Sequence, residues 1–421
     1  MSGLAQDCFA VGDDRLAVRA AHALLRQRIA PVVGRRRVEL DAAAGLALAE
    51  ALAGERDAPA FDNAAVDGFA FAFTAGMGEG GARLALLPGR AAAGHPYPDV
   101  LPPGAAVRVL TGAMMPVGAD TVALQEGAAV AGAWVTVPPG LRQGANRRRA
   151  GEDVRAGQTL LEAGTRLRPQ EIGLAAELGR SSLAVFEPLR VAILSTGDEL
   201  VDPGRALAPG GIYDANRPIL RALLKTLPVE VTDLGIVGDE PQAVRATLEA
   251  AAAGHDVVLT SGGAWRGEED HVVRTVAAHG RIDFWQIAMK PGHPLAFGRL
   301  ADAVFIGLPG NPVASMVCFL LFARPVLLRL GGFTWPSPIA VPLPAAFALT
   351  KRIGRSEYLR ARLVREAAGG LQVQKIARQG SGILTSMVEA EGLVELDAGT
   401  ERVEPGQPVP FLSFAELGIP T

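Results

Sequence analysis

Cysteine and histidine are scarce in this chain of 421 residues. The two cysteines, Cys8 and Cys318, cannot form a framework of disulfides, and such a composition is typical of a protein that works in a reducing cytosol. The six histidines are scattered without the spacing of metal ligands. This distribution argues against a structural zinc site.

The chain also lacks an excess of positive charge. Its net charge is −3, which argues against nucleic acid as the main partner. Residues 1–14 contain no apolar core of the signal-peptide kind, so the expected location is cytoplasmic. The longest apolar run, residues 312–330, is broken by Arg324-Pro325 and predicts a buried core helix, so no membrane partner is expected.

Five short apolar runs follow one another in the middle of the chain, and each ends in small or polar residues. Their alternation with helical patterns predicts βαβ units and a mostly parallel sheet. The loops that follow parallel strands gather at one edge of the sheet, where ligands bind. The runs are residues 190–194, 229–237, 256–260, 282–289 and 304–308.

Segments with the apolar periodicity of a helix lie between the first four runs. The apolar residues of 219–227 fall on one face after Asn216, which is expected to cap this helix, and Pro218 fits its first turn. Two further helical patterns begin at Pro241 and after Asp270. The central segment is therefore predicted to be a doubly wound α/β domain.

The flanking segments are predicted to form smaller domains. Helices are expected in residues 11–55, which are grouped with residues 146–185, and a small inserted β domain in residues 56–145. The α/β domain is assigned to residues 186–331, and a C-terminal β-barrel-like domain to residues 332–421. Residues 336–344 are rich in proline and predict a linker.

Several carboxylates fall in the loops at the predicted edge of the sheet. Carboxylates that meet in one place repel one another unless a cation lies among them. Hard oxygen ligands favour Mg²⁺, which proteins commonly share with a substrate phosphate. The carboxylates are Asp198, Glu199, Asp239, Glu268, Glu269 and Asp270.

Two loops of small residues are expected at the same edge, Ser261-Gly262-Gly263 and Pro309-Gly310-Asn311-Pro312. Their backbone N–H groups suit a phosphate, and Lys290 adds a positive charge. A phosphorylated or nucleotide-like ligand with a divalent cation is therefore predicted. Neither a dinucleotide fingerprint nor a P-loop is present, since Ser195-Thr196-Gly197-Asp198 follows the first strand.

Ordinary turns and helix caps could account for each of these loops alone, and only their convergence favours a ligand site. The basic-then-acidic loop at residues 146–153 leaves two interpretations open. One is a solvated linker, the commoner role of a charge run. The other is an anion clamp beside a metal-binding acid.

In their order along the chain, these motifs resemble the MoeA / gephyrin E-domain family of molybdopterin molybdenumtransferases. The resemblance runs through nearly the whole chain. The matching stretches are Phe61-Asp62-Asn63, Asp67-Gly68, Thr111-Gly112-Ala113, Gly151-Glu152-Asp153, Ser195-Thr196-Gly197-Asp198-Glu199-Leu200, Thr260-Ser261-Gly262-Gly263, Lys290-Pro291-Gly292, Gly307-Leu308-Pro309-Gly310-Asn311-Pro312 and Gln379-Gly380-Ser381.

The resemblance implies an elongated, four-domain subunit with a MoaB/Mog-like central domain that binds molybdopterin. It implies a homodimer, dimerised through the N-terminal linker domain, in which the central domain and the partner's N-terminal domains shape the cleft. The implied reaction ends molybdenum-cofactor synthesis: adenylylated molybdopterin binds, molybdate is inserted as co-substrate, and AMP is released with Mg²⁺. Other cofactor-synthesis enzymes and molybdoenzyme chaperones are the implied further partners.

By motif match, the resemblance assigns catalytic roles to Asp67, Glu199, Asp239, Asp270 and Lys290, and metal binding to Asp239, Asp270 and Glu199. Lys290, Arg148 and Arg355 would hold molybdate or phosphate. Thr111 and Ser381 would donate single hydrogen bonds. The other implied substrate-binding residues are Asp153, Ser195, Thr196, Gly197, Ser261, Gly262, Gly263, Pro309, Gly310, Asn311 and Pro312.

Five residues depart from the family pattern, and two of them are Ala64 and Phe69, which replace a common serine and tyrosine. Trp265 stands where many members have serine, and Gln286 and His293 stand where lysines are common. Two alternative functions are considered: a molybdopterin adenylyltransferase, and a non-catalytic molybdopterin-binding or scaffold paralogue. The flanking domains argue against the first, which is usually a single small domain, and the retained acids argue against the second.

Overall fold

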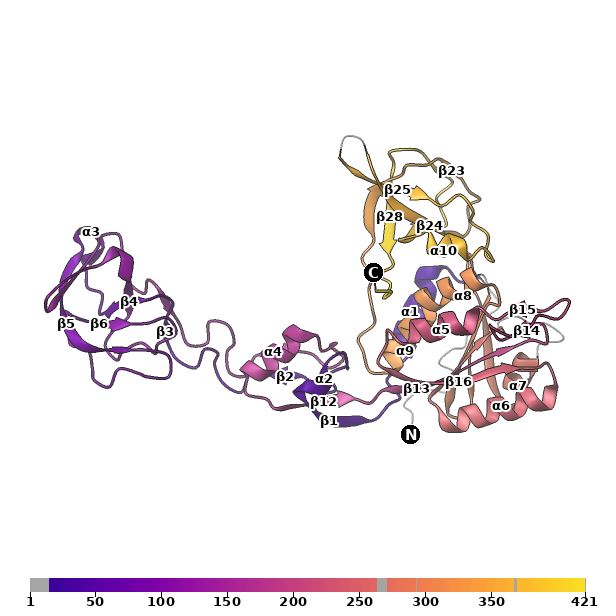
Figure 1. Cartoon of the computed structure of the whole chain (residues 1–421), viewed down its shortest axis with the longest axis horizontal. Coiled ribbons are helices and arrows are strands. Elements are labelled where there is room, and N and C mark those ends of the chain that lie inside the picture. Colours follow the sequence, from indigo (N-terminus) through magenta and orange to yellow (C-terminus); the bar gives the residue numbers. More distant parts are fainter. Residues whose placement is uncertain (1–14, 263–270, 293, 367–368, 421) are drawn as a thin grey trace. The chain divides into compact units, whose positions relative to one another are not determined.

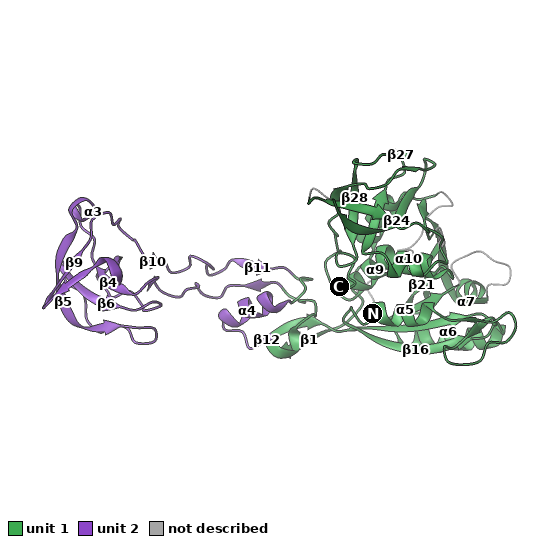
Figure 2. Ribbon diagram, turned by 45° about the horizontal axis from the view of Figure 1, so that its top comes forward, with its two compact units in different colours: residues 1–50, 163–167, 183–421 green, residues 51–162, 168–182 purple. Residues whose placement is uncertain are grey.

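The computed structural model describes residues 15–262, 271–292, 294–366 and 369–420. The chain forms two compact units, drawn in two colours in Figure 2. Unit 1 comprises residues 1–50, 163–167 and 183–421, and unit 2 comprises residues 51–162 and 168–182. Each unit has hydrophobic cores built from its own residues.

A six-stranded sheet lies at the centre of unit 1 (Figure 1). The strand β13 pairs in parallel with β16 and β17, and β17 pairs in parallel with β21. The strand β20 is antiparallel to both β21 and β18, so β18 runs in the common direction. The order is β16 (Val229–Val237), β13 (Leu189–Thr196), β17 (Val257–Ser261), β21 (Ala303–Leu308), β20 (Pro294–Leu300) and β18 (Gly280–Gln286).

The predicted mostly parallel sheet is confirmed, and its five predicted strands end at one edge. The sequence did not predict β20, because the prolines and glycine of residues 291–294 indicated only a loop. In the structure β20 forms two hairpin-like pairings that extend the sheet on the β21 side.

Helices cover both faces of this sheet, which makes it doubly wound. Side chains alternate along a strand, so Val191 and Ile193 of β13 point to one face and Ala192 and Leu194 to the other. The first pair joins the core of α1 (Val18–Arg28), α5 (Asn216–Leu224), α8 (Pro312–Cys318) and α9 (Arg324–Leu330). The second pair joins the core of α6 (Pro241–Gly254) and α7 (His271–His279).

The apolar run Pro312–Leu330 forms one 19-residue helix that is 83% buried, which confirms the predicted core helix. Its middle turn, Phe319–Ala323, is a π-helix. The wider turn ends immediately before Arg324-Pro325, where proline lacks an N–H donor and would crowd the carbonyl four residues earlier.

The C-terminal part of unit 1 is a second sheet, in the order β19-β24-β26-β28-β22, with β25 paired to β24. The prediction that residues 336–344 are only a linker is wrong, because β22 occupies their end and pairs with β28. Proline has no backbone N–H to donate to a neighbouring strand. The prolines of β22 are tolerated because β22 is an edge strand and pairs on one side only. The bounds are β19 (Met289–Lys290), β22 (Val341–Pro344), β24 (Ser356–Arg365), β25 (Leu371–Lys375), β26 (Gly392–Leu396) and β28 (Pro408–Ser413).

Unit 2 contains a six-stranded sheet that supplies the β structure predicted for residues 56–145. Its order is β7 (Thr121–Leu124), β4 (Gly68–Phe71), β6 (Ala105–Val109), β5 (Ala82–Ala91), β9 (Trp134–Val137) and β8 (Ala129–Ala131). The helix α4 (Pro169–Glu177) belongs to the same unit. The predicted domain boundaries stay predictions.

Short elements complete the described chain. The two-stranded pairs are β1 (Arg35–Glu39) with β12 (Ser182–Phe186), β2 (Leu52–Ala53) with β11 (Thr159–Leu161), β3 (Asn63–Ala64) with β10 (Arg147–Arg148), β14 (Leu200–Val201) with β15 (Ile212–Tyr213), and β23 (Leu349–Thr350) with β27 (Arg402–Val403). The short helices are α2 (Leu40–Ala43), α3 (Met77–Gly80), η1 (Gln125–Gly127) and α10 (Thr385–Val388).

Candidate functional site

The predicted site residues are divided between the two units. Asp67, Thr111, Arg148 and Asp153 belong to unit 2, and the other described ones belong to unit 1. Gly263 and Asp270 lie outside the described residues, as do Trp265 and His293.

In unit 1, the loops leave one edge of the central sheet. Ser195 and Thr196 end β13, Asp239 follows β16, Ser261 ends β17, and Pro309 follows β21. The two serines are buried, whereas Glu199, Asp239, Gly310 and Asn311 are exposed. The edge therefore combines the two buried hydroxyl groups of Ser195 and Ser261 with exposed acidic and small residues.

Asp198 and Asp239 bind each other through the loops after β13 and β16. The Asp198 backbone N–H donates to Asp239 Oδ2 at 3.2 Å, and the Asp239 N–H donates to Asp198 Oδ1 at 3.0 Å. Each carboxylate keeps one oxygen outside this pair. Asp198 was grouped with the acids of the edge but not with the site residues, and the structure shows that it fixes Asp239.

Gly197, next to this pair, has a backbone conformation that favours glycine. Gly197 has φ +144°, and a Cβ added there would overlap the carboxylate of Glu199. The missing side chain thus allows Glu199 to fold back over the turn. The Ser195-Thr196-Gly197 motif therefore places Glu199 close to its own turn, and its predicted contact with substrate stays a prediction.

Lys290 and Arg355 share one carboxylate, that of Glu357. Lys290 Nζ lies 3.9 Å from Glu357 Oε2, and Arg355 Nη2 lies 3.4 Å from Oε1. The parallel pairing of β19 with β24 places Lys290 opposite Glu357. Glu357 is 5% exposed, so it is a buried counterion beneath two partly exposed cations. Sequence reasoning missed Glu357, because it is 67 positions from Lys290 in the chain (357 − 290).

Ser381 reaches the start of α8 through its backbone. The Val313 N–H donates to the Ser381 carbonyl at 3.0 Å. The loop is held from below by Arg360, which is 1% exposed and donates to the Gly380 carbonyl at 3.1 Å and to Ser386 Oγ at 3.1 Å. Burial lowers the pKa of Arg360 to about 10. Nothing in the local sequence distinguished this arginine from a surface one.

In unit 2, Asp67 and Thr111 are in direct contact. Asp67 Oδ1 accepts from the Thr111 N–H and from the Thr111 hydroxyl, both at 2.7 Å. These two bonds, with the charge of Arg108, hold the pKa of Asp67 below its ordinary value. Thr111 donates its hydroxyl hydrogen to Asp67, so its observed role is to orient that carboxylate.

The charged loop at residues 146–153 has a fixed backbone. Asp62 binds it twice, through Arg147 Nη1 at 3.3 Å and through the Ala150 N–H at 2.8 Å. The pairing of β10 with β3 places Arg148 opposite Asn63. Arg148 and Asp153 are both exposed. The loop is therefore ordered by its own contacts, and its role as an anion clamp stays a prediction.

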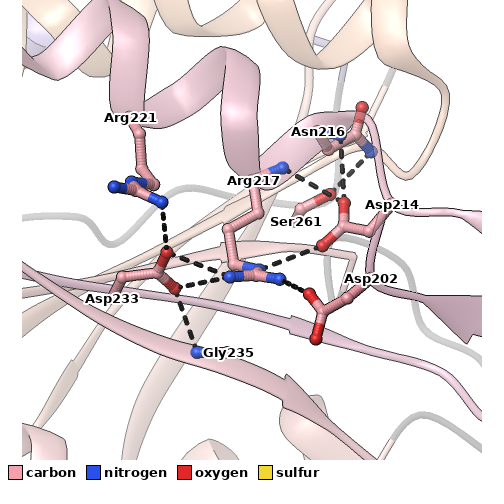
Figure 3. A network of polar contacts seen from close by, with 8 residues as sticks. All are labelled: Asp202, Asp214, Asn216, Arg217, Arg221, Asp233, Gly235 and Ser261. Atoms are coloured by element: carbon pink, nitrogen blue, oxygen red, sulfur yellow. Dashed lines mark hydrogen bonds and ion pairs between the residues drawn. The ribbon is translucent and has the colours of Figure 1, made fainter. Parts of the chain in front are cut away.

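The predicted cap of α5 is wrong (Figure 3). Asn216 is the first helical residue, and the carboxylate of Asp214 accepts instead from the N–H groups of Asn216 at 3.0 Å and Arg217 at 3.1 Å. Asp214 is 2% exposed and lies two residues before Asn216 in the chain. Asn216 is thereby released for contacts with the sheet edge.

A cavity of about 690 Å³ lies elsewhere in unit 1, between α1, α9 and the C-terminal sheet. Its lining includes His22, Arg324, Trp335 and Tyr358, and none of the predicted site residues. His22 stacks on Phe322 at 4.8 Å, and burial lowers the pKa of His22 to about 4. This cavity is therefore separate from the acidic edge of the central sheet, and its volume is no evidence about the predicted site.

Three family descriptions match successive parts of the chain. Residues 16–179 match "MoeA N-terminal region (domain I and II)", residues 192–329 match "Probable molybdopterin binding domain", and residues 342–414 match "MoeA C-terminal region (domain IV)".

Related proteins match over nearly their whole length. A molybdopterin molybdenumtransferase of Haemophilus influenzae is 36% identical over 90% of this chain and 94% of its own. One of Nostoc sp. is 34% identical over 90% and 88%. The crystal structure of a molybdopterin biosynthesis moeA protein from Pyrococcus horikoshii OT3 has a TM-score of 0.79, with 27% identity over 95% of this chain and 100% of that one.

The likeness to that crystal structure and the observed sheets together confirm the multidomain α/β fold class. The order of the three matched regions agrees with the order of the motifs along the chain. With relatives above 30% identity across nine-tenths of its length, this chain belongs to the MoeA family.

Proposed function

We propose that this protein inserts molybdate into adenylylated molybdopterin and releases AMP, as a molybdopterin molybdenumtransferase. Its place among the transferases of molybdenum-cofactor biosynthesis follows from its family. The observation that carries the proposal is the match to proteins of that name over 90% of the chain, including both flanking regions. An adenylyltransferase built from the central domain alone would not need those regions.

Mg²⁺ fits the acidic edge by the chemistry of its donors. Asp198 and Asp239 each keep one carboxylate oxygen outside their mutual hydrogen bonds, and Glu199 is exposed beside them. Oxygen donors of this kind suit Mg²⁺, which would neutralise phosphate charge when bound. The described residues contain no group of three metal-ligating side chains, and Asp270 is proposed as a further ligand on the motif match alone.

The proposed oxyanion contacts are Lys290 and Arg355. Glu357 holds both from beneath, and the side chains remain 49% and 39% exposed. Two cations on one buried carboxylate carry a net positive charge, which attracts a molybdate or phosphate oxyanion. Arginine can bind such an anion with two parallel hydrogen bonds.

Asp67 is proposed as an anionic ligand and not as a proton acceptor. Its lowered pKa means that the carboxylate stays charged at neutral pH and has little tendency to take a proton. Its second oxygen, Oδ2, is outside the two bonds from Thr111. A homodimer, a cytoplasmic location and the further partners named above complete the proposal.

AMP release from adenylylated molybdopterin, with Mg²⁺ and with or without molybdate, tests the proposal. Molybdate-dependent release with formation of active cofactor is the expected result. Rapid adenylylation of molybdopterin from ATP would instead favour an adenylyltransferase. Tight binding without release would favour a carrier or scaffold.

The metal assignment has its own test in Asp239→Asn and Asp270→Asn. Each should abolish Mg²⁺-dependent turnover without unfolding the protein, because a neutral amide is a poor magnesium ligand. Asp302→Asn is the control, since Asp302 is exposed in the turn between β20 and β21, at the opposite edge of the sheet. Undiminished turnover in both site variants would refute the metal assignment.

A further inference from the structure

We infer that Asn216 is a positioning residue for the ligand-binding edge, held by a cluster of ion pairs around the largely buried Arg217. The inference rests on the proposed function and names a residue that the family motifs did not assign. Figure 3 shows Asn216 at the start of α5, with its amide directed toward Ser261. Its task is to fix the loops after β17 and β21 relative to each other.

The amide of Asn216 binds both loops at once. Nδ2 donates to Ser261 Oγ at 2.7 Å and to the Gly310 carbonyl at 2.6 Å. A carbonyl oxygen can only accept, so the group that faces Gly310 must be the NH₂ group. The two loops also meet through the Gly262 N–H and the Leu308 carbonyl at 2.9 Å. Asn216 therefore joins three segments that are distant in sequence.

The hydrogen bond from Asn216 determines whether the Ser261 hydroxyl donates or accepts toward other groups. Because Ser261 Oγ accepts from Asn216, its own hydrogen remains available as a donor to another group. Ser195 pairs in register with Ser261, and both side chains are buried. Ser195 Oγ and Asn216 Oδ1 make no hydrogen bond to the described residues. Buried polar atoms without partners are rare, so these two atoms support the inference that a polar ligand group binds here.

The position of Asn216 is itself fixed by contacts of the neighbouring residues Asp214 and Arg217. Asp214 caps the first turn of α5, and Arg217 Nε lies 3.2 Å from Asp214 Oδ2. Arg217 Nη1 also binds both oxygens of Asp233 at 3.0 Å, and its Nη2 binds Asp202. The Arg217 side chain is 11% exposed. Three carboxylates around one guanidinium leave the first turn of α5 little freedom.

Asn216→Asp reverses the hydrogen-bonding polarity with almost no change in shape. A carboxylate only accepts, so it opposes the Gly310 carbonyl and draws the Ser261 hydrogen away from the ligand. The probe is metal-free molybdopterin, whose dissociation constant is measured alongside the KM for adenylylated molybdopterin. Both should rise by about tenfold, as expected for a misdirected buried hydrogen bond. Gln242→Glu, the same chemical change at an exposed position on α6, should alter neither.

Ser261→Ala separates positioning from folding. It removes the hydroxyl but leaves the Asn216–Gly310 contact, and it should weaken molybdopterin binding by about threefold to tenfold. The double variant should bind no more weakly than Asn216→Asp alone, because both changes remove the same donor. If Ser261→Ala binds molybdopterin with wild-type affinity, the inference is overturned. This test stays valid even when Asn216→Asp does not fold.

A merely structural role for Asn216 would give a different result. The variant would then lose thermal stability and active fraction, while the folded fraction kept the wild-type dissociation constant and KM. That outcome overturns the inference. If the wild-type protein binds molybdopterin but releases no AMP, the proposed function fails, and the dissociation constants still decide the role of Asn216. Absence of any binding by the wild type overturns both.

Discussion

At the scale of single residues, one predicted site carboxylate in each unit keeps an oxygen outside the hydrogen bonds that fix it. Asp239 uses one oxygen on the Asp198 N–H, and Asp67 uses one on Thr111. In both cases the bond fixes the carboxylate without neutralising it. Carboxylates oriented in this way are suited to hold cations or to orient a charged substrate.

The Thr111 contact gives a prediction about the charge of Asp67. Thr111→Val removes the hydroxyl donor and keeps the backbone N–H, so the pKa of Asp67 should rise toward its ordinary value of 3.8. The rise can be followed by NMR titration of the carboxyl carbon. We also expect kcat/KM for adenylylated molybdopterin to fall about fivefold, as for loss of one ordinary, solvent-exposed hydrogen bond.

The chain contains a matched control for this change. Asp397 Oδ1 accepts from the N–H and hydroxyl of Thr400, both at 2.8 Å, and these bonds likewise lower the pKa of Asp397. Thr400→Val should raise that pKa and leave kcat/KM unchanged. A fall in kcat/KM of equal size in both variants would contradict the role given to Thr111.

The lowered pKa of Asp67 also makes the stability of the fold depend on pH. A carboxyl whose pKa is lowered in the folded state stabilises the fold above its unfolded pKa. That contribution is lost as the pH falls through the lowered folded value. Thr111→Val should therefore make the protein less sensitive to acid below the unfolded pKa of Asp67.

At the scale of elements, the loop before β20 packs directly on α8. Gly292 has φ +95°, and a Cβ there would overlap Cys318 Sγ, a buried atom that donates to the Gly292 carbonyl at 3.4 Å. Gly354 has the same φ of +95° with nothing within 4 Å of an added Cβ. This pair separates the backbone cost of a left-handed residue from the cost of a clash.

We expect Gly354→Ala to lower the free energy of unfolding by about 1 kcal/mol, the backbone cost alone. Gly292→Ala should lower it by about 3 kcal/mol, because overpacking of the α8 contact is added. Denaturant unfolding measures both. Cys318→Ala in the Gly292→Ala background should recover part of the loss. Equal losses in the two single variants would show that the contact with α8 does not matter.

At the scale of the whole molecule, the two units have separate cores. Unit 2 buries the two faces of its six-stranded sheet within its own residues, and unit 1 buries both faces of the central sheet. Parts with their own cores can unfold as separate cooperative units. The tryptophans report on this, since Trp134 belongs to unit 2 and the other three belong to the sequence of unit 1.

We expect two unfolding transitions that fluorescence can assign. Trp134 packs under the guanidinium of Arg83 at 4.7 Å, so its emission should change when unit 2 unfolds. The difference between the denaturation curves of the wild type and Trp134→Phe should give a midpoint distinct from that of the remaining tryptophans. Coincident midpoints would indicate a single cooperative unit.

The sequence by itself determined the five strands of the central sheet that share one direction, the core helix at its end and the family, but not the antiparallel strand β20. These follow from local patterns: apolar runs of strand length, helical spacing, and motifs in a fixed order. It also predicted which loops leave the same edge, because strand direction in a βαβ chain decides where the loops emerge. The loops that carry Ser195, Asp239, Ser261 and Pro309 all follow that rule.

Tertiary structure alone decided the partners of the site residues. Glu357 meets Lys290, Thr111 meets Asp67, and Arg360 holds the Ser381 loop, all across large separations in the chain. Asn216 was expected to cap its helix, and only the packing of α5 on the sheet turned it toward Ser261 and Gly310. Hydrogen bonds and ion pairs form between neighbours in space, and a sequence specifies those neighbours only through the complete fold.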